Sequence, residues 1–288
     1  MKVSYLLDPK STALTMALVL LALGFLSLIS PHLASAFKTQ DERVRSLTPR
    51  QREIEKQQLR LSSAEIEERR DAVMILGAMR HVDASRAALP ALADPSAIVR
   101  ATAARTILAL PAQDTVAALI PLLADKEEFV RQEAAYALGK TRSRAAVAPL
   151  SERLLNDKKA GVRAAAAVAL GEIRDESGVM SLIQIISGGP AGGQEKSSQK
   201  NRKEKNEFVL RAAMAGLGQI RSRVAVPALV AVLAEENLAS DVKREAAHAL
   251  GLIGDPAAVP ALQAASADID PYLSRTAVEA LRRISRSR

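Results

Sequence analysis

The stretch that decides the fold reads Ala-Ala-Tyr-Ala-Leu-Gly at residues 134–139, and it returns with one change at 166–171 and at 246–251. Looser copies extend the series, so that the last position of the motif falls at Gly77, Leu108, Gly139, Gly171, Gly218, Gly251 and Arg282. Successive copies lie 31 to 33 residues apart, except for one gap of 47. A fixed period of this length is typical of stacked structural repeats.

Apolar columns run through the copies at helical spacing. One residue before the aligned position stand Leu76, Ile107, Leu138, Leu170, Leu217, Leu250 and Leu281. Five residues before it stand Ala72, Ala103, Ala134, Ala166, Ala213, Ala246 and Ala277. Columns four residues apart share one helix face. Two later columns, represented by Val116 and Leu119, predict a second helix after a short turn. We therefore expect six helix pairs and a terminal half-pair at 271–284.

The composition favours the same architecture. The chain has no Trp, four Phe and three Tyr, so its core must consist of Ala, Leu, Val and Ile. A lone helix pair cannot bury its apolar face, whereas stacked pairs can. The sequence predicts an all-α fold, a right-handed α-α superhelix over residues 65–284, behind an N-terminal hydrophobic export or anchor helix.

An uncharged run at residues 13–29 is the basis for that hydrophobic segment. Pro31 and the small residues 34–36 follow it. This order is typical of a signal peptide cut after Ala36, and it also fits a retained single-span anchor, because the run is long for the first and short for the second. We expect residues 37–288 to lie on the extracytoplasmic side of a membrane.

Changes in composition and charge divide the chain into five predicted segments. These are a signal peptide or anchor at 1–36, a charged linker and capping helix at 37–64, repeats 1–4 at 65–187, a disordered basic Gly/Lys-rich insert at 188–206, and repeats 5–6 with the half-repeat at 207–288. The net charge of +8 lies mostly outside the repeats, since 65–187 holds 16 basic and 16 acidic residues. A groove that tracks phosphates needs its charge on the folded body. We therefore expect no nucleic-acid partner.

A second motif connects the repeats with a known family. A Val-Arg pair begins five residues after each of Asp94, Asp125 and Asp157, and Ala-Leu-Gly follows two of these pairs. With these motifs, residues 65–284 resemble HEAT repeats, in particular the short subtype of phycobilisome lyase-like proteins. The resemblance implies an extended surface for partners, but it does not specify one function, because the architecture hosts many roles. We interpret the aspartates and the arginine column as an ion-pair ladder between neighbouring repeats.

We find no residue set typical of a catalytic or metal site. The chain has no Cys and three His, and His248 lies in a column that accepts every residue type, which predicts an exposed side chain. One enzyme of the HEAT-repeat class, deoxyhypusine hydroxylase, holds a di-iron centre with His-Glu pairs, and this sequence has no His-Glu dipeptide. We therefore expect no enzyme activity, no cofactor and no metal. An accessory lyase or another enzyme of this class, and a nucleic-acid binder, remain the alternatives.

Arginines gather in the turns between paired helices. Arg80, Arg142, Arg174 and Arg221 share one column, and Arg144 and Arg223 share another. In a stack such columns form a ridge, although Asp83, Asp175 and Asp255 interrupt it, and a solvated polar edge would look the same. The ridge could contact an acidic partner or, with a retained anchor, an anionic membrane surface. If it does not, we expect the site on the concave helices, with Glu152, Arg153 and Gln184 as polar candidates.

These patterns favour a scaffold rather than a catalyst. We expect an exported or membrane-tethered, non-catalytic protein that holds a protein partner on its repeat surface.

Overall fold

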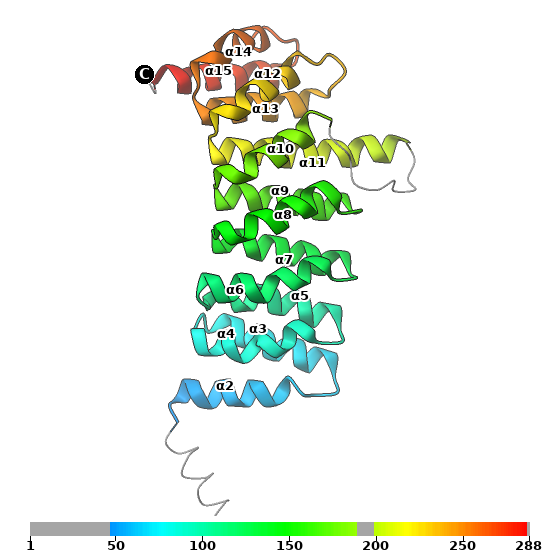
Figure 1. The fold of residues 1–288 in the computed structure, drawn as a ribbon, viewed down its shortest axis with the longest axis vertical. Coiled ribbons are helices and arrows are strands. Elements are labelled where there is room, and N and C mark those ends of the chain that lie inside the picture. Colours follow the sequence, from blue (N-terminus) through cyan, green and yellow to red (C-terminus); the bar gives the residue numbers. More distant parts are fainter. Residues whose placement is uncertain (1–46, 189–198, 287–288) are drawn as a thin grey trace, which may run out of the picture. The chain divides into compact units, whose positions relative to one another are not determined.

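The computed structural model describes residues 47–188 and 199–286, and every regular element in these ranges is helical (Figure 1). The helices are α2 (Pro49–Arg60), α3 (Ile66–Ala78), α4 (Val82–Ala88), α5 (Ala97–Thr106), α6 (Ala112–Leu119), α7 (Glu128–Thr141), α8 (Val147–Asn156), α9 (Ala160–Ile173), α10 (Val179–Ile186), α11 (Gln199–Ile220), α12 (Val226–Ala234), α13 (Ser240–Ile253), α14 (Val259–Ala265) and α15 (Pro271–Arg286). Short 3-10 turns begin or end most second helices of the pairs. The predicted all-helical repeat solenoid is confirmed.

The chain divides into two compact units, Met1–Lys56 and Gln57–Arg288, and the repeats lie in the second. In the first unit, the described residues form the start of α2. The N–H of Thr48 donates to Oε1 of Gln51 over 2.8 Å, and the N–H of Gln51 donates to Oγ1 of Thr48 over 3.3 Å. Pro49 occupies the first helical position. This capping box satisfies backbone donors that the first turn would leave free.

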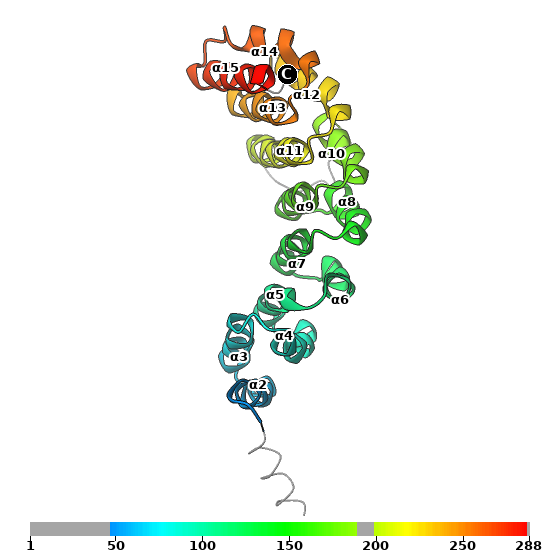
Figure 2. The ribbon, with the colours of Figure 1, turned by 90° about the vertical axis from the view of Figure 1, so that its left-hand side faces the viewer.

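The repeat helices form two rows (Figure 2). The first row holds α3, α5, α7, α9, α11, α13 and α15, and the second holds α4, α6, α8, α10, α12 and α14. In Figure 2 the first row follows the inner side of the curve, and the second row follows the outer side. The first-row helices carry the Ala-Leu-Gly motif, so the motif belongs to the concave row.

The core lies between the two rows and between neighbouring helix pairs, and each helix pair is called a repeat unit from here on. Both columns predicted as the first-helix face are buried in the first six copies, and Leu138, Leu170 and Leu250 expose 1% or less. In the second row, Leu119, Leu150 and Leu229 are fully buried. Burying such side chains stabilises each unit only when a neighbour covers it, which is the physical basis of the stack.

The glycine of the motif allows neighbouring first-row helices to approach closely. A Cβ added at Gly171 would lie 2.7 Å from Cα of Gly216, and one added at Gly139 would lie 2.8 Å from Cα of Ala169. Both contacts are with backbone, which cannot swing aside. The glycine column therefore sets the spacing of the units, including the spacing across the gap of 47 residues.

Helix α11 extends into the segment that the sequence predicts to be disordered. Its first residue is Gln199, so residues 199–206 are helical, while 189–198 lie outside the described residues. The reason is local: Gln, Lys, Arg and Glu are good helix formers, and no Gly or Pro separates this stretch from the periodic part of α11. The composition of the segment predicts a loop, but the helix propensity of residues 199–206 favours a helix.

The expected membrane localisation is corrected. Within the described ranges, no helix is long and apolar enough to cross a membrane, which conflicts with an anchor or an export segment. The longest helix, α11, has 22 residues, but its first half is rich in Lys and Glu. The run at 13–29 and the cut after Ala36 lie outside the described residues.

Candidate partner-binding surfaces

The arginine column of the first-row helices forms the expected ladder. Nε of Arg100 lies 2.7 Å from Oδ2 of Asp125, and its second terminal nitrogen donates to Oδ1 over 2.8 Å. Arg69 contacts Asp94 in the same way, and Arg131 contacts Asp157. Each pair joins one unit to the next. Two parallel hydrogen bonds fix the geometry more strictly than a single contact would. The ladder thus belongs to the stacking of the units and is not a ligand site.

The ladder shifts the pKa of its carboxylates. Hydrogen bonds from Arg100 are the main reason that the pKa of Asp125 lies below its ordinary value, while burial opposes the shift. At Asp94 burial is the largest influence and raises the pKa, but the hydrogen bonds from Arg69 and from the N–H of Ser96 outweigh it, so the pKa is lowered. Both carboxylates are therefore held ionised at neutral pH.

The predicted turn arginines occupy an unusual backbone conformation. The structure shows positive φ angles of 47°, 51°, 59° and 61° at Arg80, Arg142, Arg174 and Arg221. No other non-glycine residue of the described ranges has a positive φ. The equivalent position of the sixth pair is Gly254, with φ 76°. Glycine adopts this left-handed helix cap without steric cost, whereas each arginine costs about 1 kcal/mol.

The structure separates the two arginine columns by their partners. Arg144 reaches Asp175 over 3.5 Å, and Arg223 reaches Asp255 over 3.6 Å, each in the following unit. The four left-handed arginines are exposed, and none of them forms an ion pair within the described ranges. Asp83 contacts Arg86 instead. Asp83, Asp175 and Asp255 therefore pair with other arginines, and the positive charge of the four left-handed arginines is not compensated by an ion pair within the described residues.

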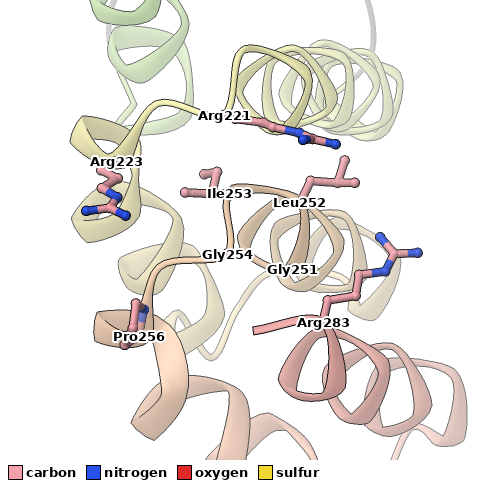
Figure 3. A pocket seen from close by; sticks show the side chains of 8 residues that line it. All are labelled: Arg221, Arg223, Gly251, Leu252, Ile253, Gly254, Pro256 and Arg283. Carbon is pink, nitrogen blue, oxygen red and sulfur yellow. The ribbon is translucent and has the colours of Figure 1, made fainter. Parts of the chain in front are cut away.

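Two open pockets lie along this edge, between the ends of successive first-row helices. One, of about 650 Å³, is lined by Lys140, Arg142, Glu172, Arg174 and residues beside them. The other, of about 690 Å³, surrounds the end of α13 and is lined by Arg221, Arg223 and Arg283 among others (Figure 3). In Figure 3 the side chains of Arg221 and Arg283 extend on the same side of that helix end, with Leu252 between them. The edge thus presents grouped guanidinium groups to solvent.

The other three candidates lie elsewhere than the sequence predicts. Glu152 and Arg153 belong to α8 and Gln184 belongs to α10, and both helices are in the second row, outside the curve (Figure 2). Arg153 also forms an ion pair with Glu152. These residues are therefore not polar groups of the concave helices. The apolar columns show that two helices pair, but they do not show which of the two faces inward.

Sequence reasoning missed the aromatic residues of the first row. The described ranges contain Phe129, Tyr136, Phe208 and Tyr272, which expose 40%, 39%, 47% and 68% of their surface. None of the four lies in the core. Phe129, Phe208 and Tyr272 stand ten residues before the aligned position, where Ile98 occupies the same place in α5. That column also holds Glu67, Gly161 and Asp241, so its mixed composition next to a buried column was the signal that these aromatic residues are exposed.

Helix α9 carries small residues at the positions that correspond to the aromatic residues of its neighbours. It lies between α7, which carries Phe129, and α11, which carries Phe208 (Figure 2). Its own residues at the columns of Phe129 and Tyr136 are Gly161 and Val168, which are small. The side chain of Gln132 from α7 fills the place that a Cβ at Gly161 would take. The exposed aromatic side chains belong to the helices on either side.

Charged groups on this row are mostly paired between units. Arg105 contacts Glu133 over 3.3 Å, and Arg211 contacts Asp241 over 2.9 Å. Lys140 contacts Glu172 at 2.5 Å. The inner row therefore combines exposed aromatic groups with compensated charge, unlike the arginine edge. Among the residues described, no group of three or more His, Cys, Asp or Glu side chains is arranged to hold a metal ion.

Comparison with known proteins places the repeats in a family. A family model of HEAT repeats matches residues 85–171, 127–190 and 200–284, more than half of the chain. The chain belongs to the HEAT-repeat family. Among solved structures, Escherichia coli YibA has a TM-score of 0.54 at 19% identity, and the match covers 84% of each chain, so the two chains share a fold. The CpcE–CpcF complex of phycocyanin lyase from Nostoc is more distant, with a TM-score of 0.46, 23% identity and coverage of 84% of this chain and 92% of that one.

One relative is an enzyme. Deoxyhypusine hydroxylase of Gallus gallus is 41% identical over 68 residues, which is 24% of this chain and 23% of that protein. The human deoxyhypusine hydroxylase structure has a TM-score of 0.41 at 20% identity, covering 81% of this chain and 84% of that one. The chain thus matches about a quarter of the curated relative's length. The sequence match to the Gallus gallus enzyme contradicts the expectation that the protein is not an enzyme. That expectation rested on the absence of a few known catalytic and metal-binding residue sets, and catalysis can also rest on other sets of residues.

Proposed function

We propose that this HEAT-repeat protein is a scaffold that holds a protein partner along the first-row face. The observation that carries the proposal is the placement of the aromatic residues. A chain whose core consists of Ala, Leu, Val and Ile leaves all four described aromatic side chains exposed on one row of helices. Aromatic residues are enriched where protein interfaces bury most surface, and repeat solenoids bind partners on extended surfaces.

The surroundings of the aromatic residues support the same surface. Helix α9, which lies between the helices of Phe129 and Phe208, has only small residues, Gly161 and Val168, at the aromatic columns. The charges nearby are already paired between units, so a partner would not have to desolvate isolated charges. The short period of 31 to 33 residues also supports assignment to the phycobilisome lyase-like repeat subtype, which we include in the proposal.

Site-specific photo-crosslinking tests this surface. We would place a benzophenone amino acid at Phe129, Tyr136 or Phe208 and irradiate cells that express the full chain. We expect a discrete protein adduct from each position. The matched control is Met180, which is 65% exposed but lies on α10 in the second row. Equal adducts from Met180, or none from the first-row positions, would contradict the proposal.

A second candidate function rests on the enzyme relative. The 41% identity over 68 residues favours a role related to the hydroxylation of deoxyhypusine. The described residues do not offer a group suited to a metal site, so we assign no catalytic residue. Mass spectrometry of a deoxyhypusine-containing protein after incubation with the full chain tests this role. Addition of one oxygen would support it, and an unchanged substrate mass would contradict it.

A further inference from the structure

We propose that Arg142, Arg174 and Arg221 bind an extended acidic segment of the partner that carries Asp or Glu at every third position. This inference rests on the proposed scaffold function and specifies its partner, while the scaffold proposal holds without it. The three arginines follow α7, α9 and α11, which are consecutive helices of the first row.

The backbone at these positions favours a different residue. Each arginine ends its helix in the left-handed conformation, and the same chain uses Gly254 at the equivalent place in the sixth unit. Because glycine fits this conformation better, the fold does not require arginine there. Non-glycine residues held in such a conformation are frequent at functional sites. The arginine side chain is therefore available for a contact outside the fold.

The charge of these side chains is available to a partner. All three are exposed, and the ion pairs of this edge within the described ranges involve Arg144, Arg223 and Lys140 instead. Arg142 and Arg174 line one open pocket, and Arg221 lines the other together with Arg283 (Figure 3). A guanidinium group binds a carboxylate through two parallel hydrogen bonds. Acidic side chains therefore complement this edge in both charge and geometry.

The spacing of the units determines the register of the partner. Packed helices lie about 8–10 Å apart, and the glycine column brings α7, α9 and α11 into close backbone contact. A polyproline II segment has three residues per turn and rises about 3.1 Å per residue, so every third side chain lies on one face about 9 Å apart. An extended chain of this kind would present one carboxylate to each arginine.

The arrangement favours a protein segment over a nucleic acid. Single-stranded nucleic acids bind where aromatic side chains stack on the bases beside a basic track. Here Phe129 and Phe208 precede Arg142 and Arg221 by 13 residues, which is about 20 Å along the helix axis. Neither phenylalanine therefore stands beside the arginine edge as a stacking platform.

Two peptides of identical composition test the register. The first repeats Glu-Pro-Pro five times, and the second carries five consecutive Glu followed by ten Pro. Fluorescence anisotropy with the full chain at about 150 mM salt measures their affinity. We expect the first peptide to bind about tenfold more tightly than the second, because only its carboxylates match the unit spacing. The triple variant R142G/R174G/R221G should bind it about tenfold more weakly.

The same variants separate binding from folding. Because glycine relieves the left-handed strain, the triple variant should have a higher Tm even though it loses binding. The reverse variant, Gly254→Arg, should lower Tm and strengthen binding of a longer peptide by extending the column. A triple variant that loses binding because it unfolds would show a lower Tm, and this result would overturn the argument from strain.

Three further results would overturn the proposal. These are equal affinity for the two peptides, unchanged affinity in the triple variant, and absence of binding by either peptide. Tighter binding of single-stranded poly(U), lost in the triple variant, would assign the edge to nucleic acid and would equally overturn it. Crosslinks from Phe129 and Tyr136 report on the scaffold function separately, so failure of the peptide leaves that function to its own test.

Discussion

At the scale of single residues, the left-handed conformation of the arginines predicts how glycine at these positions changes the free energy of unfolding. Arg174→Gly should raise the free energy of unfolding by about 1 kcal/mol, because glycine fits a φ of 59° without steric cost. The control is Arg275→Gly at an exposed position in the interior of α15, which should lower it by about 1 kcal/mol. Urea unfolding monitored by circular dichroism measures both. Destabilisation by both substitutions would show that Arg174 has a structural role.

The motif glycines make the opposite prediction at the same scale. Gly171→Ala should destabilise by about 1–3 kcal/mol, because the new Cβ would lie 2.7 Å from the backbone of Gly216. Gly161→Ala in the same helix is the matched control. Its Cβ would meet only the end of the Gln132 side chain and the carboxylate of Glu128, which can move. We expect Gly161→Ala to be neutral or stabilising in thermal melts. An equal loss in both variants would contradict the packing argument.

At the scale of the helices, the ladder makes stability depend on pH. The folded pKa of Asp125 lies below its ordinary value of about 3.9. Its contribution is therefore present above that value and is lost as the pH falls through the folded pKa. Asp125→Asn should lower the free energy of unfolding by about 3 kcal/mol at pH 7, and it should flatten the loss of stability in acid.

Urea unfolding at pH 7 and at pH 3 measures this effect. The control is Asp114→Asn, at an exposed position of α6. If both variants showed the same difference between the two pH values as the unaltered chain, the ladder would not be the source of the acid sensitivity.

At the scale of the whole repeat body, each unit depends on its neighbours. Helix α9 has first-row neighbours on both sides, whereas α15 ends the described stack. We therefore expect backbone amides of α9 to exchange hydrogen more slowly than those of α15. Leu170→Ala, in the core, should destabilise by about 2–5 kcal/mol, and His248→Ala, at a half-exposed side chain, by less than about 0.5 kcal/mol.

Hydrogen exchange followed by mass spectrometry checks the gradient. Leu170→Ala should speed exchange in α7 and α11 as well as in α9, because these helices share the interface that it weakens. Equal protection of α9 and α15 in the unaltered chain would contradict a stack held together by nearest neighbours.

The sequence by itself determined the helix pairs, their period, the buried columns and the Arg–Asp ladder. These follow from local propensity and from apolar spacing, both of which repeat in every copy. The tertiary structure alone decided which row lies inside the curve, and therefore that Glu152 and Gln184 are not concave while Phe129 and Phe208 are. It also decided that Arg174 and its equivalents adopt a left-handed conformation. Which row lies inside the curve depends on how neighbouring helix pairs pack, and periodicity within one pair carries no information about that packing. The left-handed caps depend on how each helix ends, and an arginine does not predict this conformation as a glycine does.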